Sequence, residues 1–201
     1  MRKVIAFMHV SLDGFVAGTN GELNWVSHGE DVQQYVDQLI GTTGIAMYGR
    51  TTYQMMHSYW TTVPTNPASL PRDVEHANWV ENVTKIVFSR SLENADWNNT
   101  TLVKDHIPQT IAKLKAQVGK SLMIFGSPRL THSFMELDLI DEYRLTINPV
   151  ILGTGIPLFT SATKPNSLKL LETQTFESGV IAVVYERIKT SLEPATQNQT
   201  E

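Results

Sequence analysis

The chain of 201 residues contains no cysteine. This absence excludes a disulfide framework, a thiolate nucleophile and a cysteine-ligated zinc centre, and it is compatible with a reducing compartment such as the cytoplasm. The formal net charge of -4 is spread along the chain without basic or acidic blocks. We therefore expect neither nucleic acid nor a membrane to be a partner, and the first apolar run, which ends near Val10, is too short to cross a bilayer.

Motifs of several common enzyme classes are also missing. The sequence has no G-x-x-x-x-G-K-[ST] phosphate loop, no G-x-G-x-x-G fingerprint and no G-x-S-x-G nucleophile elbow. Their absence disfavours the common ATPases and GTPases, the standard dinucleotide fold and the acyl hydrolases. The six histidines lack the spacing typical of metal ligands, so we expect no metal site.

The apolar pattern predicts a three-layer α/β/α fold around a mostly parallel sheet. Short continuous apolar runs bounded by turn residues are typical of buried strands, and segments with helical spacing lie between them. This alternation favours parallel strands joined by helical crossovers. The predicted strands are residues 4–9, 44–48, 85–88, 121–125 and 143–147, and the predicted helices lie around residues 32–40, 107–118 and 129–137.

The last third of the chain predicts an antiparallel edge. Two β-rich runs, residues 168–176 and 180–188, are separated by a short connection that contains Gly179, which indicates a hairpin. Residues 61–71 hold three prolines and predict a surface loop. We expect one domain over residues 1–189, followed by a disordered tail over residues 190–201 that lacks the apolar residues needed to order itself.

Three turns at the carboxyl ends of predicted strands are candidate phosphate sites. After the first of these strands, Gly49 permits close backbone approach, Arg50 offers a planar fork, and Thr51 or Thr52 can cap a helix whose free N–H groups attract anions. An ordinary strand-to-helix turn with a surface arginine explains the same residues equally well.

The other two turns follow residues 85–88 and 121–125. Ser89 and Arg90 suit a ribose 2′-phosphate, although strands commonly end in such a pair. Gly126 and Ser127 precede a helix with an early proline and could hold a pyrophosphate. The three turns matter jointly, because open α/β sheets bind ligands at the carboxyl ends of their strands.

Read together with the opening SLDGFVAG, these segments resemble the dihydrofolate reductase superfamily, and within it the reductase domain of riboflavin biosynthesis proteins and their stand-alone bacterial relatives. The resemblance runs from about Arg2 to Ile188. Its most specific pieces are SLDGFVAG, YGRTTY and the segment from Leu139 to Phe159, which contains NPVILGTGIPLF.

The resemblance implies a dihydrofolate reductase-like fold and an NADPH-dependent oxidoreductase that transfers a hydride to a pterin, a pyrimidine such as a 5-amino-6-(5-phosphoribosylamino)uracil, or a related heterocycle. It also implies a homodimer, in which NPVILGTGIPLF could pack against its copy. The cofactor residues that it implies are His9, Val16 and Ala17 for the nicotinamide, Gly49, Arg50, Thr51 and Thr52 for the phosphates, Ser89 and Arg90 for the 2′-phosphate, and Gly126, Ser127, Arg129 and Leu130 for the pyrophosphate.

On the substrate side, the resemblance implies roles for Trp25 and Thr146, and it places Glu30 or Asp31 nearest to the position of a catalytic carboxylate. Asp31 is also a good helix start, and that interpretation stays open. Asp13 beside Gly14 is typical of a turn. The segment from Asp13 to Trp25 is a candidate lid.

One departure from the family pattern motivates a second hypothesis. Relatives usually have two or three glycines where this chain has Phe125, Gly126 and Ser127. Since phenylalanine adopts left-handed backbone conformations less readily than glycine, the approach to pyrophosphate could be looser. The alternative function is therefore a non-catalytic, nucleotide-binding dimeric module of the same fold.

Overall fold

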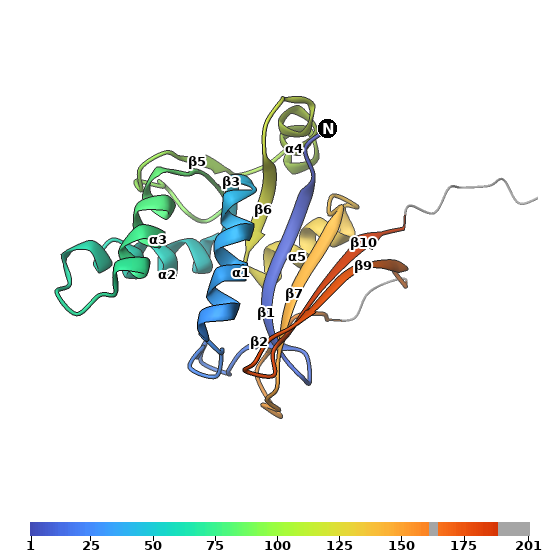
Figure 1. Cartoon of the computed structure of the whole chain (residues 1–201). Helices are drawn as coiled ribbons and strands as arrows, with labels where there is room; N and C mark the ends of the chain where they lie inside the picture. Colours follow the sequence, from blue (N-terminus) through green and yellow to red (C-terminus); the bar gives the residue numbers. More distant parts are fainter. Residues whose placement is uncertain (161–164, 189–201) are drawn as a thin grey trace, which may run out of the picture.

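The computed structural model describes residues 1–160 and 165–188, and within these ranges a sheet of eight strands forms the centre of the molecule (Figure 1). Its strand order is β5-β4-β3-β6-β1-β7-β10-β9. The strands are β1 (Val4–Ser11), β3 (Thr43–Gly49), β4 (Thr84–Phe88), β5 (Thr100–Val103), β6 (Ser121–Phe125), β7 (Glu142–Asn148), β9 (Leu168–Thr175) and β10 (Ile181–Arg187). The helices are α1 (Glu30–Gly41), α2 (Arg50–Trp60), α3 (Pro71–Asn82), α4 (Ile107–Ala116) and α5 (Pro128–Glu136).

Helices cover both faces of the sheet, as the predicted three-layer fold requires (Figure 1). Val4, Ala6 and Met8 of β1 pack on one face with residues of α4 and α5. Ile5 and Phe7 point to the opposite face and pack with α1, and α2 and α3 lie on the same side over β3 and β4. The alternation along β1 therefore contributes to two separate cores, which explains why its sequence is a continuous apolar run.

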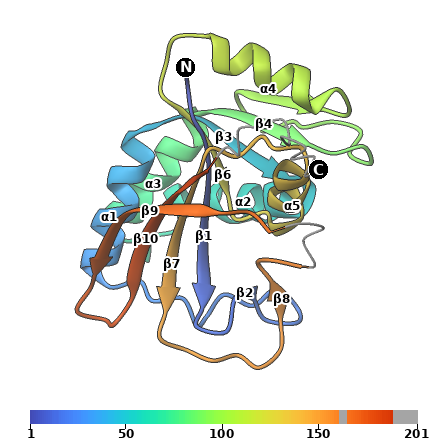
Figure 2. The same ribbon diagram turned by 90° about the vertical axis from the view of Figure 1, so that its right-hand side faces the viewer.

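The predicted parallel sheet and the antiparallel edge are both confirmed. β1 pairs in parallel with β6 and β7, and β3 pairs in parallel with β4 and β6. β10 runs antiparallel to β7 and β9, and the connection between β9 and β10 turns at Gly179 with a φ of +80°. Figure 2 shows the two strands of this hairpin beside β7.

The structure adds elements that the sequence pattern did not predict. Helix α3 and edge strand β5 lack a clear apolar period, and the proline-rich loop contains a short 3-10 turn, η1 (Val63–Thr65), with Val63 buried. Two further short strands, β2 (Phe15–Ala17) and β8 (Ile156–Pro157), form a separate two-stranded sheet. The predicted tail over residues 190–201 lies outside the described residues. Among the residues that are described, no helix combines the length and apolarity needed to span a bilayer.

Lys85 fixes helix α3 against strand β4. Its side chain is fully buried, and Nζ donates hydrogen bonds to the carbonyl oxygens of Val80, Glu81 and Val83 at 2.6, 2.9 and 3.0 Å. These carbonyls lie at the carboxyl end of α3, where a helix leaves acceptors without intrahelical partners. Nζ also lies 4.7 Å from the centroid of the Trp97 ring. Desolvation lowers the pKa of Lys85 to about 8, but its charge complements the end of the helix dipole.

We expect Lys85→Met to lower the free energy of unfolding by roughly 2–3 kcal/mol, because it leaves buried carbonyl oxygens without a donor. Chemical denaturation followed by circular dichroism measures the change. The exposed Lys113 on α4 provides the matched control, and Lys113→Met should change the free energy by less than about 0.5 kcal/mol. Equal stability of the two variants would contradict the capping role of Lys85.

Candidate functional site

Two helix N-termini meet at the carboxyl edge of the sheet, between neighbouring strands β3 and β6. Helix α2 follows β3 onto one face, whereas α5 follows β6 onto the other. Neither helix has a side-chain cap on its first turn. Helix geometry leaves the backbone N–H groups of the first turns without intrahelical acceptors. The sheet edge between two strands whose helices leave to opposite faces is the usual ligand position in open α/β sheets. We call this position between β3 and β6 the crevice.

The two turns are in direct contact. The backbone N–H of Gly49 donates a hydrogen bond to Ser127 Oγ at 3.0 Å. A Cβ atom built on Gly49 would lie 3.7 Å from Cβ of Leu130, and one built on Gly126 would lie 3.5 Å from Cγ2 of Thr52. The structure thus brings together the residues predicted for the phosphates and those predicted for the pyrophosphate.

The conformation of the second turn removes the predicted difficulty with Phe125. Phe125 ends β6 in the extended region, and the left-handed residues are Gly126 and Ser127, with φ of +57° and +58°. Phe125 does not need a left-handed conformation, so it does not loosen the approach of the backbone to a pyrophosphate. The conformational cost falls instead on Ser127, whose hydroxyl accepts the hydrogen bond from Gly49.

The turn after β4 joins the same edge through Arg50. Nη1 of Arg50 donates a hydrogen bond to Ser91 Oγ at 2.8 Å, and Ser89 Oγ accepts one from the N–H of Leu92 at 3.0 Å. Arg90 is exposed next to this turn, and Arg129 is exposed on the first turn of α5. Three guanidinium groups therefore belong to the turns that surround the two helix N-termini.

The SLDGFVAG segment is held by the NPVILGTGIPLF segment. Asp13 accepts hydrogen bonds through Oδ1 from Ser11 Oγ at 2.7 Å and from the N–H of Leu152 at 3.2 Å, and through Oδ2 from the N–H of Gly153 at 2.8 Å. These hydrogen bonds, led by the one from Ser11, lower the pKa of Asp13. Asp13 thus keeps its charge and stabilises a turn, as its position before Gly14 predicts.

The predicted nicotinamide segment continues into the two-stranded sheet of β2 and β8. Val16 and Ala17 are both 8% exposed, and Ala17 pairs with Ile156. A Cβ atom on Gly155 would lie 2.3 Å from the carbonyl oxygen of Ala17, so only glycine allows this approach. Since β2 lies inside the predicted lid, the first part of that segment is anchored, and the lid is not free to move as a unit.

His9 and Thr146 form a pair on neighbouring strands, β1 and β7. They are register partners, and His9 Nδ1 lies 2.5 Å from Thr146 Oγ1. Thr146 is fully buried, whereas His9 is partly buried near the carboxyl end of β1. Desolvation, with a smaller contribution from His28, lowers the pKa of His9 to about 4. The imidazole is therefore neutral at physiological pH.

Aromatic rings continue from His9 across the α1–α3 face of the sheet. Ring centroids are 5.1 Å apart for Phe7 and His9, 6.1 Å for Phe7 and Phe125, and 5.7 Å for Trp79 and Phe125. Phe125 and Trp79 are partly exposed. Sequence reasoning missed this group, because Trp79 lies on the unpredicted helix α3.

The two predicted catalytic carboxylates lie at the start of α1. Asp31 Oδ1 accepts a hydrogen bond from the N–H of Val32, and Oδ2 accepts one from the N–H of Glu177 in the β9–β10 turn, both at 2.8 Å. Glu30 is exposed, and both residues line an open hollow of about 660 Å³ beside Glu177. Asp31 therefore joins the helix to the hairpin, and a catalytic role stays a prediction.

Trp25 lies on the segment that precedes α1. Its Nε1 donates a hydrogen bond to the carbonyl oxygen of Glu22 at 3.0 Å. Two residues later, the N–H of Ser27 donates to Asn148 Oδ1 at the end of β7, at 2.9 Å. The segment is thereby attached to the same sheet edge as Thr146, but no interaction joins Trp25 to the His9–Thr146 pair within the described residues.

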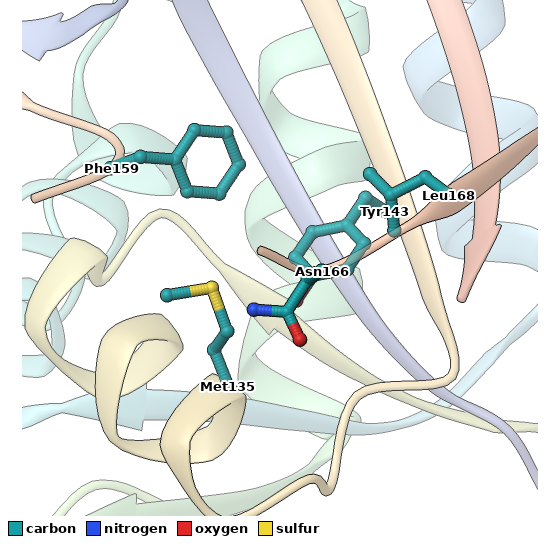
Figure 3. A pocket seen from close by; sticks show the side chains of 5 residues that line it. All are labelled: Met135, Tyr143, Phe159, Asn166 and Leu168. Carbon is teal, nitrogen blue, oxygen red and sulfur yellow. The ribbon is translucent and has the colours of Figure 1, made fainter. Parts of the chain in front are cut away.

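A separate apolar hollow lies away from this edge. Met135, Tyr143, Phe159, Asn166 and Leu168 surround a cavity of about 180 Å³, and Figure 3 shows their side chains grouped around it. Tyr143 belongs to the amino-terminal half of β7, and Met135 lies in the last turn of α5. The cavity is therefore not part of the crevice between β3 and β6.

Comparison with known proteins gives a consistent result. The model of the RibD C-terminal domain family matches residues 2–182. The chain is 35% identical to the uncharacterized protein YyaP of Bacillus subtilis over 188 residues, which cover 92% of this chain and 94% of that protein. It is 30% identical over 181 residues to the uncharacterized protein YwjB of the same organism, covering 89% and 95% of the two chains.

Solved structures resemble the whole chain as well. A putative riboflavin biosynthesis protein from Shewanella sp. PV-4 is 25% identical, with a TM-score of 0.75 over 93% of this chain and 99% of that one. Dihydrofolate reductase from Enterococcus faecalis, solved with NADP(H), is 16% identical, with a TM-score of 0.60 over 93% and 97% of the chains. The latter likeness establishes the dihydrofolate reductase-like fold alone.

We expect Asp13→Ala to speed amide hydrogen exchange at Leu152 and Gly153 by at least about tenfold, because both N–H groups lose their acceptor. Asp13→Asn retains a carbonyl oxygen and should release only one of the two amides. Native-state exchange measured by NMR resolves the difference. Unchanged exchange at both positions in Asp13→Ala would show that Asp13 does not hold the two segments together.

We expect the imidazole of His9 to titrate near pH 4, and NMR of its ring resonances measures the midpoint. The unfolded chain takes up the proton near pH 6.5, so the folded state loses stability as the pH falls from 6.5 towards 4 and levels off below. The difference between the two pKa values corresponds to a loss of roughly 3 kcal/mol at most in the free energy of unfolding. The His9→Gln variant should show a shallower decline, and an identical pH dependence would contradict the lowered pKa.

Proposed function

The chain belongs to the RibD C-terminal domain family, and from this premise we propose that it is an NADPH-dependent reductase of a small heterocyclic compound. The observation that carries the proposal is the pair of uncapped helix N-termini at the crevice between β3 and β6. The family and the dihydrofolate reductase-like fold support a reductase. The named substrate and the cofactor are our proposal.

The residues present fit the phosphates of a dinucleotide. The free N–H groups of Arg50, Thr51 and Thr52 on α2, and of Arg129 and Leu130 on α5, offer hydrogen-bond donors from two directions. The positive ends of both helix dipoles add to the attraction for an anion. Because Ser127 Oγ is engaged with Gly49, the donors stay available instead of being capped by a side chain.

Ser89 and Arg90 would distinguish NADPH from NADH. Arg90 is exposed, and the Arg50–Ser91 hydrogen bond holds its turn against the start of α2. A guanidinium group suits the planar, bidentate recognition of a phosphate. The 2′-phosphate is the only group that differs between the two cofactors, so the preference should depend on this turn.

The bound nicotinamide would supply a hydride for the reduction of a C=N or C=O group. On the substrate side, the chain offers the neutral His9, which contacts the buried Thr146 and Phe7, and the partly exposed ring of Phe125. Aromatic groups of this kind suit a flat ring. A phosphorylated substrate would need a further cation. Arg144 lies on the α1 face of β7, but its Nε donates to the buried carboxylate of Glu142 at 2.5 Å, and Lys164 lies outside the described residues.

We expect saturable, micromolar binding of NADPH by the purified protein, with NADH bound at least about tenfold more weakly. Arg90→Ala should weaken the binding of NADPH by about tenfold or more and leave that of NADH unchanged, because only NADPH carries the phosphate. Quenching of tryptophan fluorescence during titration measures both affinities.

Arg72→Ala provides the control. Arg72 is exposed on α3, and its replacement removes the same charge from the chain. Equal loss of affinity in both variants would indicate a general charge effect rather than a 2′-phosphate site. Failure of the wild-type protein to bind either cofactor would exclude the reductase and favour the non-catalytic dimeric module.

A further inference from the structure

The His9–Thr146 hydrogen bond favours one of the two neutral tautomers of His9. Thr146 Oγ1 has no second partner among residues 1–160 and 165–188, so His9 Nδ1 is the acceptor available for the hydroxyl proton. A neutral imidazole holds one proton, and when Nδ1 accepts a hydrogen bond that proton lies on Nε2. The pair thus favours the tautomer in which His9 is an N–H donor at Nε2.

The donor of His9 is available to a ligand. Nε2 makes no hydrogen bond within the described part of the chain, and it is not one of the side-chain atoms there that are both buried and unpaired. It is therefore reached by solvent. His9 lies near the carboxyl end of β1, and the start of β2 follows within the same turn. His9 and the segment of Val16 and Ala17, which is predicted to meet the nicotinamide, thus both lie near the carboxyl end of β1.

The surroundings of His9 include aromatic rings that suit a flat ligand. The buried Phe7 contacts the imidazole edge to face, and the partly exposed Phe125 continues the row of rings towards Trp79. Aromatic side chains bind a planar ring through stacked or edge-on contacts. Asp31, one of the two predicted catalytic carboxylates, already accepts two backbone hydrogen bonds. His9 Nε2, in contrast, is not engaged within the described residues.

We propose that Nε2–H of His9, held in this tautomer by Thr146, donates a hydrogen bond to the reducible ring of the substrate, which is a heteroaromatic compound with an acceptor atom beside the carbon that receives the hydride. This inference rests on the proposed reductase function. It assigns a specificity-determining role to the His9 side chain, whereas the resemblance implies only a backbone contact.

The donor would act on charge that develops during reduction. The hydride adds to the carbon of the C=N bond, the π electron pair moves to nitrogen, and that nitrogen takes a proton from water. The two electrons come from the reduced nicotinamide. A hydrogen bond from a neutral imidazole stabilises the electron-rich nitrogen without an acidic side chain, a use of neutral histidine that is known from other enzymes.

The experiment measures the binding of pterin, an unphosphorylated probe, by its own fluorescence. His9→Leu removes the donor and should weaken pterin binding about tenfold, which is the effect of one net hydrogen bond. His9→Gln places an amide N–H at a similar reach and should stay within about threefold of the wild type. Circular dichroism and thermal unfolding verify that each variant is folded.

Thr146→Val tests the tautomer of His9 directly. In the wild type, nitrogen NMR should show the proton of His9 on Nε2, whereas the valine variant should show both tautomers and a weaker affinity for pterin. Thr101→Val, on the exposed edge strand β5, is the matched control. A proton on Nδ1 in the wild type would overturn the proposal, as would equal pterin affinity in the wild type and His9→Leu, or no pterin binding by the wild type.

Titration of the wild type with NADPH separates this inference from the proposed function. Binding of NADPH together with pterin affinity that does not depend on His9 overturns the inference alone. Pterin binding that depends on His9, without any binding of NADPH or NADH, overturns the proposed function and retains His9 as the ring-binding donor.

Discussion

The candidate site depends on the parallel pairing of β1 and β3 with the strand between them, β6. Parallel register places the carboxyl ends of all three strands at one edge, although β6 follows β3 by more than seventy residues of sequence. The helices that follow β3 and β6 must then leave to opposite faces, because each packs against a different core. The crevice and its two helix N-termini are consequences of this strand order, not of any single binding residue.

The sequence predicts the parts of this arrangement that are encoded locally. The buried strands are continuous apolar runs, and Gly49, Ser89 and Gly126 mark the points where three of them end. The strand order is not local information, and no pattern in the segments 44–48 and 121–125 indicates that they are neighbours. Helix α3 was missed because few of its side chains are buried, and Lys85, which looks like an ordinary polar strand residue, fixes its end through three carbonyl groups.

The turn after β6 illustrates how one position can be misjudged from composition. The departure from a glycine-rich pattern drew attention to Phe125, but the left-handed conformations belong to the two residues that follow. Gly126 adopts such a conformation without a steric penalty, whereas Ser127 does so at a cost of the order of 1 kcal/mol. The hydrogen bond from Gly49 to its hydroxyl offsets part of this cost and ties the two turns together. The ring of Phe125 packs with Phe7, Tyr48 and Trp79 on the α1–α3 face of the sheet.

The two sides of the crevice therefore have different chemistry, and the difference favours a reductase over a phosphate-transferring enzyme. Arg50, Arg90 and Arg129 belong to the turns around the helix N-termini, whereas the region near His9 contains aromatic rings, a hydroxyl-bound imidazole and an Arg144 that is paired with Glu142. A phosphoryl-transfer site needs positive charge around the reacting atoms. Hydride transfer instead needs the phosphates of the cofactor to be held at one end, and a dry surface that orients the nicotinamide ring and the substrate ring. In the proposed reductase, the arginines of the turns would hold the phosphates, and the rings near His9 would offer the oriented surface.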